Sequence, residues 1–277
     1  PLLIVSALEE AGYTVHFQDY QTYRAERKPS IETFYRFIKD APGAIIGLNA
    51  YSSILPTVLG AVRQLKAEFP RKTVILGGPS PTDTPVEIMR AFPVDLIVLG
   101  EGELTVVDLM RTLEDGGDLD EVAGIVYRRD GEIRVTPRRP RVKDLDSLPL
   151  PAYHRINFAD YGHMVHILTA RGCPYQCKFC SVHSVWERQV TYRTAESIER
   201  ELHLVRDQVR EIRFADDTFV LSKRRVLEMI ALMRKVGLKV PWRANGRLDL
   251  MDDDLLEAMG ESGCHVMMVG LESGSTR

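Results

Sequence analysis

Three of the four cysteines in this chain lie within eight residues of one another, at Cys173, Cys177 and Cys180. An apolar run over residues 165–169 precedes them and predicts a strand, so we expect a strand, a cysteine loop and a helix that opens at the triplet. Iron–sulfur clusters usually take four cysteines. Three ligands leave one iron open, and the spacing therefore predicts a cluster with a position free for chemistry.

Two other interpretations of the triplet stay open. His183 follows Cys180 by three residues and could complete a Cys3His zinc site. Zinc ligands usually come as two separated pairs, so the spacing favours a cluster. A disulfide is disfavoured, because no segment reads as a signal peptide and cytosolic thiols stay reduced. The fourth cysteine, Cys264, is isolated beside an apolar run and is expected in the core.

The triplet resembles the signature of radical S-adenosylmethionine (SAM) enzymes. The resemblance implies a 4Fe-4S cluster on Cys173, Cys177 and Cys180, with SAM chelated to the fourth iron. It also implies that the reduced cluster splits the sulfonium carbon–sulfur bond to give methionine and a 5′-deoxyadenosyl radical. Phe179, just before the last cysteine, fits the same group. The cofactor would then carry the chemistry, and the protein would supply position and exclusion of water.

Composition limits the partners. A length of 277 residues suits two domains, and 44% hydrophobic residues support ordinary cores. The net charge of −3 gives no general attraction to nucleic acid or anionic lipid. No apolar run is long enough to cross a bilayer. We therefore expect a cytoplasmic protein with no membrane span and no nucleic-acid partner.

The first half alternates predicted helices and strands. Helices are expected over residues 2–11, 31–39 and 55–69, and strands over residues 13–17, 44–48, 73–76 and 96–99. Near-continuous apolar strands separated by helices indicate a parallel sheet covered on both faces. We predict an α/β, doubly wound domain over residues 1–123, with ligands at the carboxyl ends of its strands.

Loops at these strand ends resemble a cobalamin-binding domain. The matching motifs are Ser53 to Leu55, the pair Gly77 and Gly78, and the run Gly-Glu-Gly-Glu from Gly100. The resemblance implies that the nucleotide tail of cobalamin would lie against six residues: Ser53, Leu55, Gly77, Gly78, Gly100 and Glu101. No cobalt-ligating histidine motif is found, and we expect a first strand before Leu2 to be missing. His16 is expected to be an ordinary half-buried strand residue.

Residues 124–160 are predicted to connect two domains. Arg129 to Gly131 separate two alternating apolar stretches, which predicts a hairpin. The proline-rich segment 137–151 predicts a solvated linker.

The second half, residues 161–277, repeats a strand–helix unit. Strands are expected over residues 165–169, 211–215, 240–244 and 265–270, and helices over residues 195–206, 224–236 and 254–259. Such a series predicts a partial (β/α) barrel with its site at the carboxyl ends of the strands. We expect further barrel strands beyond Arg277.

The resemblance assigns roles to residues near these strand ends. Asp216 or Asp217 would accept a hydrogen bond from the methionine ammonium group of SAM, where many relatives use Gly-Gly-Glu. Arg243 or Arg247 would meet its carboxylate, and Glu272 its ribose hydroxyls. The alternative is that Asp217 and Ser273 are helix N-caps.

Three runs, residues 211–219, 245–249 and 270–275, resemble one subfamily most. It includes the anaerobic magnesium-protoporphyrin monomethyl ester cyclase and cobalamin-dependent methylases. The resemblance implies methylation or oxidative cyclisation of an unreactive carbon in a small molecule, with a reducing protein such as flavodoxin or ferredoxin. Two alternatives are a non-catalytic Cys3His zinc module and a radical methylthiotransferase acting on tRNA. The latter predicts three more cysteines in the first domain, which has none.

Overall fold

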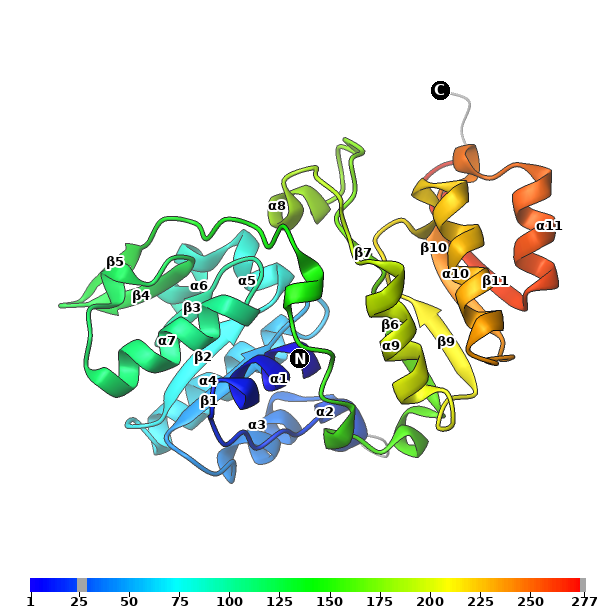
Figure 1. The fold of residues 1–277 in the computed structure, drawn as a ribbon. Coiled ribbons are helices and arrows are strands. Elements are labelled where there is room, and N and C mark those ends of the chain that lie inside the picture. The colour runs from blue at the N-terminus through cyan, green and yellow to red at the C-terminus, as the bar shows by residue number, and fades with distance from the viewer. Residues whose placement is uncertain (24–28, 275–277) are drawn as a thin grey trace. The chain divides into compact units, whose positions relative to one another are not determined.

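The chain forms two compact units in the computed structural model, Pro1–Val142 and Lys143–Arg277 (Figure 1). The structure describes residues 1–23 and 29–274, apart from the side chains of residues 183 and 184. Within these described ranges, no helix combines the length and the apolar character that a bilayer crossing requires.

The first unit contains a five-stranded sheet with the order β1-β2-β3-β4-β5. The strands are β1 (Ile45–Asn49), β2 (Thr73–Gly77), β3 (Leu96–Val98), β4 (Ile125–Arg129) and β5 (Glu132–Val135). The first three strands are parallel, and the β4–β5 hairpin adds two antiparallel strands to the edge of β3. The predicted hairpin is confirmed, and it belongs to the sheet of the first unit rather than to a connecting segment.

Helices cover both faces of this sheet. They are α1 (Leu2–Glu10), α2 (Tyr20–Tyr23), α3 (Ile31–Lys39), α4 (Leu55–Glu68), α5 (Pro79–Asp83), α6 (Pro85–Ala91) and α7 (Glu103–Asp115), with a short 3-10 turn η1 (Leu119–Glu121). Val74 and Leu76 of β2 pack in one core with α3 and α4, while Ile75 packs in a second core with Leu109 of α7. The parallel sheet with two covered faces is therefore confirmed.

The strand predicted over residues 13–17 is wrong. Its residues alternate between half-buried and exposed, as the pattern required, but they form no ladder and β1 pairs with β2 alone among the described strands. Alternation reports which side chains face the protein, and a strand also needs a neighbouring backbone to pair with. Residues 13–17 have the first property without the second.

The second unit contains a four-stranded, fully parallel sheet with the order β11-β10-β9-β6. Its strands are β6 (Met164–Ile167), β9 (Glu211–Phe214), β10 (Trp242–Gly246) and β11 (Cys264–Val269). Each strand lies beside the next one along the chain, as in a (β/α) barrel. A second, two-stranded sheet joins β7 (Ala170–Arg171) to β8 (Thr191–Tyr192).

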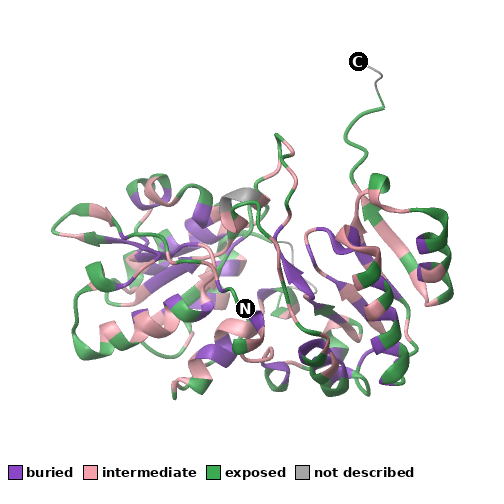
Figure 2. Ribbon diagram, turned by 45° about the horizontal axis from the view of Figure 1, so that its top comes forward, coloured by how far each residue is buried: buried purple, intermediate pink, exposed green. Residues whose placement is uncertain are grey.

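Helices α9 (Ala195–Val205), α10 (Lys223–Lys235) and α11 (Asp253–Glu261) pack on one face of the sheet of the second unit (Figure 1). The short helix α8 (Val182–Trp186) follows the cysteine loop away from that sheet. The unit also contains the 3-10 turns η2 (Leu145–Ser147), η3 (Tyr153–Arg155), η4 (Phe158–Tyr161), η5 (Phe219–Leu221) and η6 (Leu248–Leu250). Buried residues concentrate on the strands and on the helix faces turned toward them (Figure 2).

Two predicted boundaries in this unit shift. The strand predicted over residues 240–244 begins at Trp242, because Pro241 has no N–H to donate to a ladder. The Pro241 carbonyl still accepts a hydrogen bond from the Ile212 N–H at 3.1 Å. The helix expected to open at the cysteine triplet starts at Val182, after the last cysteine.

Candidate functional site

The cysteine loop lies between β7 and α8, beyond the carboxyl end of the first barrel strand. Cys173, Cys177 and Cys180 are free thiols of intermediate exposure. The Cys180 N–H donates to the Cys177 carbonyl at 3.1 Å, which closes a turn between these two cysteines. Gly172 precedes the triplet with φ of +96°, a backbone conformation that glycine adopts without strain. The loop therefore presents three thiols to one side of the sheet edge.

Residues after β9 hold the start of the cysteine loop. One carboxylate oxygen of Asp217 accepts a hydrogen bond from the Gly172 N–H at 3.0 Å. The Cys173 sulfur lies 3.4 Å from the hydroxyl oxygen of Thr218. Asp217 thus supports the backbone that leads into the triplet, as an N-cap-like acceptor would.

Arg247, which follows β10, contacts the centre of the loop. Its guanidinium lies 3.9 Å from the centre of the Tyr175 ring and donates an N–H toward the Cys177 sulfur at 3.7 Å. Asp249 accepts from the same guanidinium at 2.8 Å and raises the pKa of Arg247. Arg247 thus connects the end of β10 to the cysteine loop through Tyr175 and Cys177.

The donor set of this loop is three thiols, the ligand type that iron–sulfur clusters take. Among the described residues, no group of three or more histidine, cysteine, aspartate or glutamate side chains converges on one metal position. The side chain of His183, the fourth ligand of the zinc alternative, lies outside the described residues.

Asp216, one of the two predicted acceptors for the ammonium group of SAM, is buried and 3% exposed. Its two oxygens accept from the backbone N–H of Thr169 at 2.6 Å and from the hydroxyl of the same residue at 2.5 Å. Burial raises the pKa of Asp216 to about 6.

Arg243 is also placed away from the cysteine loop. It forms an ion pair with Glu211, the first residue of β9. His265 contacts the same carboxylate at 2.9 Å. Glu211 begins β9, two residues before Arg213, which is the register partner of Arg243, so this ion pair lies toward the amino ends of the strands. Glu272 is exposed beyond β11, with φ of +55°.

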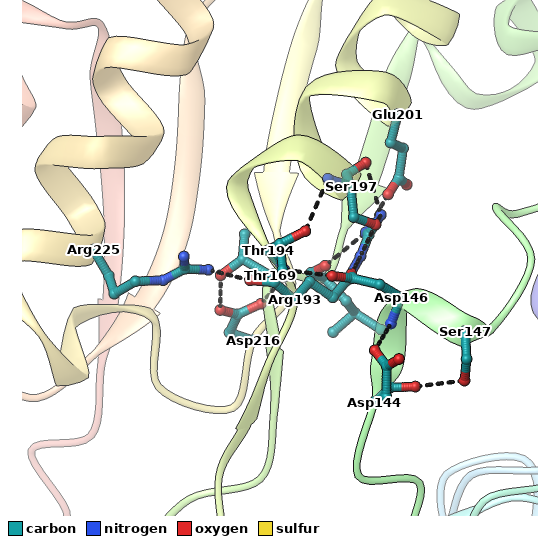
Figure 3. Close-up of polar contacts among 11 residues, drawn as sticks. Asp144, Asp146, Ser147, Thr169, Arg193, Thr194, Ser197, Glu201, Asp216 and Arg225 are labelled. Carbon is teal, nitrogen blue, oxygen red and sulfur yellow. Dashed lines mark hydrogen bonds and ion pairs between the residues drawn. The ribbon is translucent and has the colours of Figure 1, made fainter.

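A buried ion pair beneath the loop escaped sequence reasoning. Arg193 pairs with Glu201 of α9, which is 1% exposed, and donates to the Leu168 carbonyl at 3.0 Å (Figure 3). The hydroxyl of Tyr153 donates to Glu201 at 2.6 Å. Burial is the main reason that the pKa of Tyr153 is raised, and the negative charge of Glu201 raises it further. Asp146 accepts from the Thr194 N–H at 2.9 Å.

One sequence signal could have revealed this pair. Glu201 occupies the apolar face of its helix, together with Ile198, Leu202 and Val205. A carboxylate on such a face requires a buried cationic partner. The partner itself, eight residues earlier in the chain, has no periodic signature.

In the first unit, the loops after β1, β2 and β3 are joined by hydrogen bonds. The Thr82 hydroxyl donates to the Gly78 carbonyl at 2.9 Å and accepts from the Gly100 N–H at 3.1 Å. Gly78 has φ of +108°, and a Cβ there would lie 2.8 Å from the Ala50 carbonyl oxygen. The predicted glycines therefore gather at one sheet edge, where the backbone is accessible for want of side chains.

The other predicted residues of this edge have mixed positions. Gly77 ends β2, Leu55 begins α4, and Ser53 is exposed in the turn before that helix. One oxygen of Glu101 accepts from the Val142 N–H at 2.8 Å, so this carboxylate fastens the last residue of the unit.

Two family profiles match the chain. The B12 binding domain matches residues 2–110, and the radical SAM superfamily matches residues 167–277. An uncharacterized methyltransferase of Pyrococcus horikoshii is 32% identical over 249 residues, covering 87% of this chain and 54% of that protein. The anaerobic magnesium-protoporphyrin IX monomethyl ester cyclase of Synechocystis is 28% identical, with 83% and 48% covered. The chain thus spans about half the length of these curated relatives.

Solved structures share the fold over nearly the whole chain. The cobalamin-dependent SAM radical enzyme OxsB, with aqua-cobalamin and SAM bound, gives a TM-score of 0.81 at 20% identity, covering 99% of this chain and 41% of that one. The radical SAM methyltransferase TsrM of Kitasatospora setae, with tryptophan and a SAM analogue bound, gives 0.77 at 16% identity, covering 99% and 56%. The chain therefore carries a B12 binding domain followed by a domain of the radical SAM superfamily.

Proposed function

We propose that the protein is a radical SAM enzyme that uses a 4Fe-4S cluster and cobalamin to methylate or oxidatively cyclise an unreactive carbon. The observation that carries this proposal is the cysteine loop. It places Cys173, Cys177 and Cys180 as free thiols at the carboxyl edge of a parallel sheet, beside Asp217 and Arg247. Active sites of (β/α) barrels lie at this edge.

The residues of the chain would hold and orient these cofactors. The three thiolates would anchor three irons and leave the fourth to SAM. When bound, the cluster supplies the electron that splits SAM into methionine and a 5′-deoxyadenosyl radical. Asp217 and Arg247 contact the cysteine loop and, with Glu272, are our candidates to hold SAM, whereas Asp216 and Arg243 contact Thr169 and Glu211.

Cobalamin would lie against the glycine edge of the first unit. Gly100 has open space where a side chain would stand, which suits a bulky ligand, and Gly78 lets the loops after β1 and β2 approach each other closely. Among the similar solved structures, OxsB and TsrM hold cobalamin, and TsrM also holds a 4Fe-4S cluster. These reports support the proposal without assigning a residue of this chain.

The remaining roles follow from the same chemistry. The substrate would be a small molecule, and a low-potential protein such as flavodoxin or ferredoxin would reduce the cluster. We place the protein in the cytoplasm, where thiolates remain reduced. A methylthiotransferase is disfavoured, because residues 1–172 contain no cysteine.

The test uses the full-length protein, purified and reconstituted without oxygen. We expect about four irons and sulfides per chain, a brown colour, and 5′-deoxyadenosine on reduction with SAM. Replacing any one of Cys173, Cys177 and Cys180 with alanine should abolish both the iron content and the SAM cleavage.

Cys264→Ala is the matched control. Burial raises the pKa of Cys264 to about 11, so its thiol stays protonated, and we expect this variant to keep the cluster. A colourless wild-type protein that holds stoichiometric zinc would overturn the proposal. If the protein cleaves SAM, methyl-labelled SAM distinguishes methylation from cyclisation, because only a methylase transfers the label to its product.

A further inference from the structure

The sheet face of the second unit that lies opposite its helices carries a row of nitrogen-bearing side chains. His166 of β6 is the register partner of Arg213 of β9, and Arg213 is the register partner of Arg243 of β10. On each strand the neighbouring residues are buried, as Ile212 and Trp242 show. Since side chains alternate between faces, the three members of the row share the other face.

Only one carboxylate neutralises this row among the described residues. Glu211 pairs with Arg243, and the same oxygen contacts the His265 ring at 2.9 Å. Its negative charge is therefore shared between two groups. Hydrogen bonds from His265 and Arg243 keep the pKa of Glu211 low despite its partial burial.

Arg213, the middle member, lacks such a partner. Within residues 1–23 and 29–274, its Nε atom is buried and has no hydrogen-bond partner. The neighbouring His166 supplies no negative charge to Arg213. Partial burial of its ring lowers the pKa of His166, and the positive charges of Arg213 and Arg243 lower it further. The row therefore has an excess of positive charge in its centre.

Without a bound ligand, this row of positive groups destabilises the folded protein. Like charges on adjacent strands repel, and a buried donor without an acceptor loses its hydrogen bond to water. A planar guanidinium with free N–H groups is well suited to a carboxylate or a phosphate, which accept two parallel hydrogen bonds. A bound anion would satisfy Arg213 and reduce its repulsion with Arg243.

We propose that the row formed by His166, Arg213 and Arg243 binds an anionic oxygen group, a carboxylate or a phosphate, of the small-molecule substrate. This inference rests on the proposed function for the identity of the ligand. The row lies on the strands themselves, below the loops that carry the cysteines and Arg247, so it would hold a part of the substrate distant from the reacting carbon.

The test measures anion binding by the full-length reconstituted protein, using inorganic phosphate and acetate as separate probes in titration calorimetry. We expect one site per chain. Arg213→Gln should weaken it by about tenfold or more, as befits a lost charged hydrogen bond. Arg224 is an exposed arginine on α10, away from the row, so Arg224→Gln is the matched control and should bind within about twofold of the wild type.

Protection from phenylglyoxal gives a second readout that needs no variant. The peptide containing Arg213 should be protected by the tighter probe, while the peptide containing Arg224 should not. Arg213→Lys covers the case in which the glutamine variant fails to fold, and it should bind with intermediate affinity. The stronger of the two probes identifies the anion as phosphate or carboxylate.

Equal binding by Arg213→Gln and the wild type, or no binding by the wild type, would overturn the inference. Neither result depends on SAM cleavage. A protein that binds the probes through Arg213 but never yields 5′-deoxyadenosine would instead contradict the proposed function alone.

Discussion

The two units present their strand ends in opposite ways. The edge of the first unit is built from glycines and from hydroxyl-to-backbone hydrogen bonds, such as those that link Thr82 to Gly78 and Gly100. The edge of the second unit is built from thiols and charged side chains, where Asp217 and Arg247, from the loops after β9 and β10, contact the cysteine loop. The first edge offers space and backbone, and the second offers charge and metal ligands.

This difference shows how one rule of α/β architecture serves two kinds of ligand. Both edges lie at the carboxyl ends of parallel strands, where loops converge. A large ligand held by shape needs side chains removed, whereas a metal cluster needs side chains supplied. The second unit also buries an ion pair, that of Arg193 with Glu201, away from water.

The largest effect should come from the buried ion pair of Arg193 with Glu201. Glu201→Ala would leave the guanidinium of Arg193 buried without its carboxylate, which typically costs about 3–5 kcal/mol. We expect a loss of this size in the free energy of unfolding of the second unit, measured by denaturant titration. The first unit should be unaffected.

Glu199→Ala on the same helix provides the control. Its ion pair with Lys235 is at the surface, where Lys235 is 64% exposed, so the loss should stay below about 1 kcal/mol. Equal losses from the two variants would contradict the view that the second edge depends on buried charge.

A pH-dependent effect follows from Asp216. Burial raises its pKa from 3.8 to about 6 in the folded protein, so folding favours the neutral form. Its contribution to stability is therefore present below pH 4 and is lost as the pH rises through 6. The loss could reach about 3 kcal/mol by the linkage relation. Denaturant titrations at pH 5 and pH 7.5 should show the second unit less stable at the higher pH.

The Asp216→Asn variant sharpens this test, because an amide does not ionise in this range. Its stability should change less between the two pH values than that of the wild type. If the stability of the variant depends on pH as strongly as that of the wild type, another group is responsible for the titration.

An intermediate effect is expected at the glycine edge. Gly78→Ala would place a Cβ 2.8 Å from the Ala50 carbonyl oxygen on a backbone with φ of +108°. We expect a loss of about 1–3 kcal/mol in the first unit and weaker cobalamin binding, measured by denaturation and by absorbance titration. Gly77→Ala is the matched control, because its Cβ would have no neighbour closer than 4.0 Å.

The smallest effect should come from Arg247. Arg247→Gln removes a cation that donates toward Cys177 and stacks on Tyr175. A lost hydrogen bond of about 0.5 kcal/mol corresponds to roughly 20 mV for a one-electron couple. The midpoint potential of the cluster, followed by electron paramagnetic resonance, should become more negative. A shift to a more positive potential would contradict this role.

Sequence patterns predicted the architecture well, because both units bury one face of each helix and most of each strand. The helix over Ile31–Lys39 is found at its predicted bounds, where the Ser30 hydroxyl caps the Thr33 N–H at 3.0 Å. Failure came at residues 13–17, where alternation was present but no partner strand was. Pairing is a tertiary property that local periodicity does not contain.

The candidate site was predicted less evenly. The cysteine triplet lies in one short segment, so its spacing alone could predict it. Asp216 and Arg243 were predicted because they lie near strand ends, and in the fold Asp216 bonds to Thr169 while Arg243 pairs with Glu211 across the neighbouring strand. Which side chain reaches a ligand depends on the neighbours that compete for it, and these are distant in sequence.

The β4–β5 hairpin has a practical consequence for anyone who wishes to study the first unit on its own. Its outermost strand carries Glu132 and Arg134, and Arg134 pairs with Asp120 at 3.0 Å. A fragment cut at residue 123 would leave the backbone N–H and C=O groups along the edge of β3 unpaired, and such an exposed strand edge promotes self-association. A fragment that ends at Val142 would keep that edge capped by a charged ribbon and should remain dispersed.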